Sequence, residues 1–146
     1  MAGETINAPS AAWHTVQAAA STADAALCGG TRTAINATSL SSDEELYPVL
    51  DFRLTVSVGT PTVNTTVDVY RRSKGDGTNE APAPVAADFL HEYVGSFVLD
   101  NSAATQYYYL WGVSNNDPEA TYYMVNNGGT TLTIALAVQS RGWDTV

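Results

Sequence analysis

Apolar and polar residues alternate along most of the chain from residue 49 onward. The clearest run is LDFRLTVSV at residues 50–58, in which every second residue is apolar. Because side chains on a strand alternate between its two faces, this run predicts one face toward a core and one toward water. The dominant element of the chain is therefore expected to be the β-strand.

The same alternation predicts five further strands. They are expected at residues 63–72, 91–99, 106–113, 120–125 and 131–139. Short links with turn-forming residues separate the first predicted strand from the second (GTP at 59–61) and the fifth from the sixth (NNGG at 126–129), so each of these two strand pairs is expected to form a hairpin. In the strand at 91–99, Tyr93, Phe97 and Leu99 are expected to share one face.

The N-terminal part of the chain follows a different pattern. Residues 11–20 are rich in alanine, which has the highest helix propensity, and predict one short helix. We interpret residues 1–26 as an arm that becomes ordered against another surface; an ordinary first strand with a frayed terminus is the alternative. Residues 31–38 have strand composition, and the polar residues 39–48 fit one helical turn.

Together these elements indicate an all-β protein of two packed antiparallel sheets. A β-sandwich of the jelly-roll kind, with an extended N-terminal arm, is the expected architecture, and a closed barrel is the second choice. The expected organisation is an arm at 1–26 followed by a sandwich domain at 27–146.

Composition narrows the kinds of partner. The 146 residues carry a formal net charge of −9, and Lys74 is the only lysine. Without a basic stripe, binding to nucleic acid or to an anionic membrane surface is not expected, whereas a basic or mixed protein surface fits. The single Cys28 forms no internal disulfide, and no secretory signal or membrane span is apparent, so folding in a reducing cytoplasm is expected.

No arrangement of residues indicates catalysis, a metal or a cofactor. His14 and His91 are the only histidines, and no GxSxG sequence surrounds a serine. The carboxylate pair Glu44 and Glu45 and the acidic residues at 76–88 are interpreted as surface charge rather than as a glycosidase pair. Oxygen-bearing residues at 76–80 are interpreted as a glycine turn rather than as a calcium site, because the EF-hand pattern is absent.

The densest feature is the aromatic sequence YYYLW at 107–111, together with Tyr122 and Tyr123. Tyr107, Tyr109 and Trp111 are expected to fill the core. Tyr108 would then stand outside, with Tyr123, at a protein contact or beneath a sugar ring; cross-strand pairing that only stabilises the sheet is the alternative. The residues expected to contact a partner are Trp13, Val16, Asp76, Asn79, Tyr108, Tyr123 and Trp143.

Four sequences carry a resemblance to a known class of proteins: LDFRLTV (50–56), VDVYRRSKGDGTN (67–79), YVGSFVLD (93–100) and YYMVNNGGTTL (122–132). Over residues 48–140 the chain resembles small β-sandwich virion proteins of tailed bacteriophages, which decorate or cement capsids or belong to the tail or neck. The resemblance implies a non-enzymatic virion component, made in the host cytoplasm, that binds the major capsid protein as a homo-oligomer. A carbohydrate- or receptor-binding module is the alternative from another class.

Overall fold

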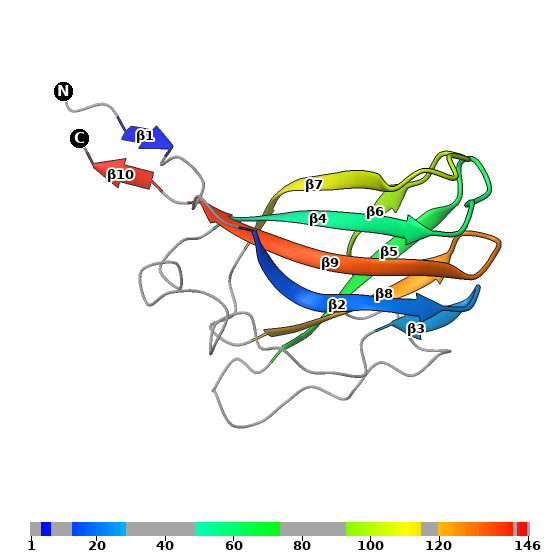
Figure 1. The fold of residues 1–146 in the computed structure, drawn as a ribbon. Helices are drawn as coiled ribbons and strands as arrows, with labels where there is room; N and C mark the ends of the chain where they lie inside the picture. Colours follow the sequence, from blue (N-terminus) through cyan, green and yellow to red (C-terminus); the bar gives the residue numbers. More distant parts are fainter. Residues whose placement is uncertain are drawn as a thin grey trace.

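The computed structural model describes residues 4–6, 13–28, 49–73, 93–114, 120–141 and 143–145 (Figure 1). These ranges form strands joined by turns, and none of them contains a helix. The strands are β1 (Glu4–Ile6), β2 (His14–Thr22), β3 (Ala26–Cys28), β4 (Val49–Val58), β5 (Thr66–Ser73), β6 (Tyr93–Val98), β7 (Gln106–Ser114), β8 (Ala120–Asn127), β9 (Leu132–Arg141) and β10 (Trp143–Thr145).

Eight of these strands form two four-stranded sheets, and every strand pair is antiparallel. The first sheet has the order β2-β9-β4-β7, and the second has the order β3-β8-β5-β6. The short strands β1 and β10 pair with each other apart from both sheets (Figure 1). The predicted all-β class with two antiparallel sheets is confirmed.

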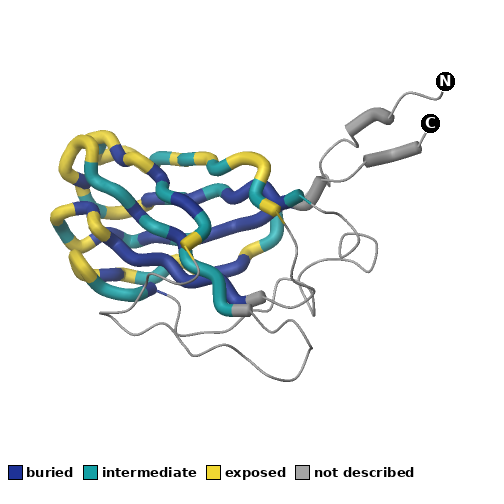
Figure 2. The backbone as a smooth tube through the Cα atoms, turned by 180° about the vertical axis from the view of Figure 1, so that it is seen from behind, coloured by how far each residue is buried: buried dark blue, intermediate teal, exposed yellow. Residues whose placement is uncertain are grey.

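The two sheets enclose one apolar core, as the alternating pattern requires. On β4, Leu50, Phe52 and Leu54 are completely buried. They meet residues of the second sheet, and the ring centroids of Phe52 and Tyr122 lie 4.8 Å apart. Figure 2 shows buried positions running along the strands, while exposed positions gather at the connections at one end of the sheets.

The order of the strands follows one rule of pairing. Strand β5 pairs with β6, β4 with β7, β3 with β8, β2 with β9 and β1 with β10. The described strands are therefore arranged as one long antiparallel hairpin, with its midpoint between β5 and β6. The hairpin is folded over so that β4 also pairs with β9, and β5 with β8.

This arrangement contradicts both predicted hairpins. Strands β4 and β5 belong to different sheets, as do β8 and β9, so the links at 59–65 and 128–131 cross between the layers. In the first link, buried Pro61 has no N–H for a ladder, and Asn64 takes a left-handed backbone conformation with φ of 63°. The turn residues were recognised correctly, but they redirect the chain into the other layer.

Next to the second link, Asn126 near the end of β8 is fully buried and connects the β2–β3 and β8–β9 turns. Its Nδ2 donates to the carbonyl oxygens of Thr22 and Thr130, at 2.8 Å each. Its Oδ1 accepts the Gly128 N–H at 2.9 Å. The amide thereby satisfies backbone groups at the end of β2 and in the β8–β9 link, and holds this end of the two sheets together.

The helix predicted over residues 11–20 is wrong. Residues 14–22 form β2, which pairs with β9 and buries Val16, Gln17 and Thr22. Pairing and burial outweigh the helix propensity of alanine, which is worth less than about 1 kcal/mol per residue. An ordinary strand is thus present in this region, while the division of the chain at residue 26 stays a prediction. The elements expected at 31–38 and 39–48 lie outside the described residues.

Candidate interaction surface

The aromatic residues of β7 lie on the opposite face from the one predicted. Tyr107, Tyr109 and Trp111 are 55%, 45% and 61% exposed, whereas Tyr108 and Leu110 pack against the core. The register with β4 explains this, because residues directly opposite each other in an antiparallel pair share a face. Tyr108 lies opposite Leu54, and Leu110 lies opposite Phe52, so both take the buried side.

A β-bulge ends the row of exposed rings. Between two register pairs, β7 has Trp111 and Gly112 where β4 has only Asp51. Gly112 has a φ of 73°, and its N–H donates to Oδ1 of Asp51 at 2.9 Å. Because the extra residue reverses the alternation, Val113 turns inward although Trp111 points outward. An uninterrupted alternation over residues 106–113 would have placed these two side chains on one face.

The exposed rings pack against one another and around an arginine. The rings of Tyr109 and Trp111 are stacked, with centroids 5.1 Å apart and an interplanar angle of 4°, and the centroid of Trp13 lies 5.9 Å from that of Tyr109. Arg53 of β4 places its Cζ 4.9 Å from the Trp13 centroid and 5.7 Å from that of Tyr107, within cation–π range. We call these residues, Trp13, Arg53, Tyr107, Tyr109 and Trp111, the aromatic surface.

The second sheet carries a polar network on its outer face. Asp68 accepts hydrogen bonds from Ser96 Oγ at 2.5 Å and from Asn127 Nδ2 at 2.7 Å. The hydroxyls of Ser96 and Tyr93 lie 2.6 Å apart, and the Tyr93 ring contacts Tyr70 edge-on at 5.7 Å. Burial, and then the charge of Asp68, raise the pKa of Tyr70, so this phenol stays protonated at neutral pH.

Tyr93 reaches this outer face because of a second bulge. The register passes from Val69 opposite Gly95 to Tyr70 opposite Tyr93, which leaves Val94 as the extra residue of β6. Val94 then packs against the core, and Tyr93 is 55% exposed. The expectation that Tyr93 and Phe97 share one face is therefore wrong.

A pocket of about 380 Å³ lies between the edge strands β6 and β7, next to both bulges. Its apolar residues Val94, Leu110 and Val113 pack on the core. Among the described residues, its lining consists of Arg71, Tyr93, Val94, Leu110, Trp111, Gly112, Val113 and Ser114. Trp111 belongs to both the pocket and the aromatic surface. Neither feature could be predicted from the order of the predicted strands along the chain.

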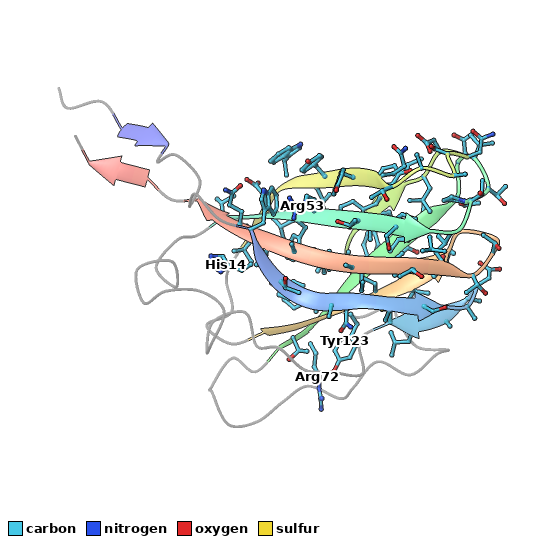
Figure 3. All side chains as sticks on the ribbon, viewed as in Figure 1. His14, Arg53, Arg72 and Tyr123 are labelled. Carbon is cyan, nitrogen blue, oxygen red and sulfur yellow. The ribbon has the colours of Figure 1, made fainter. Side chains whose placement is uncertain are left out.

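The predicted contact residues do not form one site. Trp13 belongs to the aromatic surface, but Val16 lies in the core at 2% exposure and Tyr123 is 8% exposed. Tyr108 is half-buried, and its hydroxyl donates to Oδ1 of Asp100 at 3.2 Å. Tyr123 and Arg53 lie on different sheets (Figure 3).

The remaining predicted contacts are residues near the C-terminus and residues that follow β5 in the chain. Trp143 is in β10, where the structure describes the backbone, and Asp76 and Asn79 lie outside the described residues. The residues of the aromatic surface that the sequence prediction missed are the half-buried Arg53 and the exposed Tyr107, Tyr109 and Trp111. The sequence contained one signal that could have located these residues. The apolar residues of β4 from Leu50 to Val56 lie on one face, so the side chains of a paired strand that lie opposite them must also face the core.

Two observations on the described side chains concern metal binding and thiol chemistry. No group of three or more histidine, cysteine, aspartate or glutamate side chains among them is placed to hold a metal ion. Cys28 is buried, and this burial raises the pKa of its thiol, which keeps it protonated and unreactive. None of the described segments is a helix of the length and hydrophobicity needed to cross a membrane.

Comparison of the chain with protein-family models, with curated proteins and with solved structures found no match. The interpretation of the aromatic surface and the pocket therefore rests on their own geometry and chemistry. Both features lie at the β7 edge of the first sheet, and both expose rings that neighbouring rings hold in place.

Proposed function

We propose that this protein is a non-enzymatic structural protein of a tailed-phage virion, a decoration or cement protein that binds the major capsid protein. The sheet orders support a jelly roll, since a long hairpin folded into two four-stranded sheets is the arrangement of that fold. Jelly rolls occur in viral capsid proteins and in lectins, and their function lies in surfaces added to the scaffold. The proposal therefore depends on the surface.

The aromatic surface is the observation that carries the proposal. Tyrosine, tryptophan and arginine are the residues most enriched at the energetic centres of protein interfaces. Here four rings and one guanidinium are gathered on the outer face of β4 and β7, and three of the rings are about half exposed or more. Neighbouring rings hold one another in place, which reduces the side-chain entropy lost when a partner binds.

In this function the protein acts by adhesion. A copy seated across the joint between capsid subunits buries surface on both of them and so opposes their separation. Many copies on a symmetric shell multiply a contact that is weak by itself. The net charge of −9 favours a partner surface that is basic or mixed.

Capsid binding by paired variants tests this proposal. Tyr107→Ala removes a ring from the aromatic surface, and Tyr93→Ala removes an equally exposed ring, 55% in each case, from the other sheet. Co-sedimentation with heads that lack the protein should show binding weakened about tenfold or more by Tyr107→Ala together with Tyr109→Ala, and little changed by Tyr93→Ala. If the wild type, the Tyr107→Ala/Tyr109→Ala double variant and Tyr93→Ala bind the heads equally well, the aromatic surface does not contact the capsid.

The position on the particle needs a separate measurement. A subunit of the tail or neck makes the same demands on a contact surface as a capsid protein does. Electron microscopy of the assembled particle distinguishes these positions and shows the number of copies in contact. Heads that resist heat and osmotic shock equally well with and without the protein would contradict a cementing role.

A further inference from the structure

The pocket between β6 and β7 has the construction of a ligand site. Its volume of about 380 Å³ lies within the range of about 300–1,000 Å³ that is typical of small-molecule sites. On the core side it is apolar, formed by Val94, Leu110 and Val113. Two large rings, Tyr93 of β6 and Trp111 of β7, line it and are 55% and 61% exposed.

Both rings are held in place by contacts outside the pocket. Tyr109 stacks on Trp111 at 5.1 Å and covers one face of the indole. Tyr70 contacts Tyr93 edge-on at 5.7 Å, and Ser96 fixes the Tyr93 hydroxyl at 2.6 Å. The two ring positions therefore exist before any ligand arrives, and a ligand that uses them need not order them.

The polar groups of the pocket define the ligand further. Arg71 and Ser114 line it, and no carboxylate is among the lining residues that the structure describes. A guanidinium has five N–H donors, so Arg71 can bind a ligand carboxylate in addition to its contacts within the protein. We propose that this pocket binds a sugar unit that carries a carboxylate, such as a hexuronate.

The combination of groups favours this class over simpler ligands. A purely apolar ligand would displace water from the guanidinium and the Ser114 hydroxyl without replacing its hydrogen bonds, which costs free energy. A neutral sugar would use the rings and the hydroxyl but not the charge of Arg71. A hexuronate presents C–H faces to Tyr93 and Trp111, hydroxyls to Ser114 and a carboxylate to Arg71. The inference concerns the isolated protein and stands independently of a place on a virion.

Titration of the whole chain with glucuronate and with glucose, followed by NMR, tests the proposal. The expected result is saturable shifts of the Trp111 indole N–H and of Tyr93 with glucuronate, and weaker binding of glucose. Trp111→Ala should weaken glucuronate binding about tenfold, the equivalent of 1.4 kcal/mol. Trp111→Phe should restore part of it, because the phenyl ring keeps a stacking face.

Two more variants separate the pocket from general effects on the surface. Arg71→Gln should remove the preference for glucuronate over glucose, while Tyr107→Ala, which changes an exposed ring outside the lining, should bind both sugars like the wild type. Absence of saturable shifts with glucuronate would overturn the proposal, as would equal loss of binding in Tyr107→Ala. Neither result bears on capsid binding, which co-sedimentation measures by itself.

Discussion

Replacing Asn126 by alanine should be among the most damaging single substitutions in the described part of the chain. The Asn126 side chain is fully buried and makes three hydrogen bonds, to the Thr22 and Thr130 carbonyls and to the Gly128 N–H. Thr22 is the last residue of β2, and Thr130 and Gly128 belong to the β8–β9 link; the links after β2 and after β8 each pass from one sheet to the other. The alanine variant loses all three bonds and leaves their backbone partners without a replacement.

The magnitude follows from the bond count. A neutral hydrogen bond contributes about 1 kcal/mol net, and a buried group left without a partner costs about 1–3 kcal/mol. Asn126→Ala should therefore lower the free energy of unfolding by about 3 kcal/mol. For a domain of this size, that loss corresponds to a fall in Tm of about 10 °C.

The neighbouring Asn127 supplies a matched control. It is exposed, and its amide donates one hydrogen bond, 2.7 Å long, to Asp68 Oδ2. Asn127→Ala removes the same chemical group from the adjacent position and should cost about 0.5 kcal/mol, since exposed polar contacts contribute little. Urea unfolding followed by circular dichroism measures both values. If the two variants have the same midpoint, the buried amide does not hold this end of the sheets together.

Three further predictions concern other single positions. Ala25 has a φ of 57°, so Ala25→Gly should raise the free energy of unfolding by about 0.5 kcal/mol, while Ala23→Gly lowers it by a similar amount; urea midpoints give both values. Gly112→Ala should cost about 1 kcal/mol and Gly112→Asn less, because no atom lies within 4 Å of an added Cβ and the left-handed backbone alone causes the strain. Burial raises the pKa of the Cys28 thiol above its ordinary value of 9.0, so its contribution to stability is complete below pH 9.0 and is lost as the pH rises through the folded-state pKa. Cys28→Ala should lack this part of the alkaline decline, and an unchanged pH profile of its urea midpoint would refute the assignment.

The strands that the sequence predicts well are those with one strongly apolar face. Residues 50–56 alternate so regularly that β4 could be located and its inner face assigned without any partner. The pairing of strands was not predictable in the same way. The links at 59–65 and 128–131 contain good turn residues, but whether a turn returns to the same sheet depends on strands that are distant in sequence. For β4, these are its partners β7 and β9.

The faces of β7 were assigned wrongly for a related reason. The sequence YYYLW is aromatic or apolar at every position, so a period of two does not favour one face over the other. The choice is made by β4, whose Phe52 and Leu54 place Leu110 and Tyr108 inward. Gly112 made the assignment of faces harder. A glycine within a strand indicates a β-bulge, but it does not indicate which side chains the bulge directs to the other face.

The two bulges connect these observations. Val94 is the extra residue on β6 and Gly112 lies in the bulge of β7, and both residues line the same pocket. Each bulge sits where a ring points outward, Tyr93 before Val94 and Trp111 before Gly112. Bulges are frequent at sheet edges and beside functional sites, because they aim a side chain that regular pairing would direct elsewhere. Two regular edge strands would have placed Tyr93 on the same side as Phe97 and turned Val113 outward beside Trp111, and the pocket would have lost both a ring and part of its apolar side.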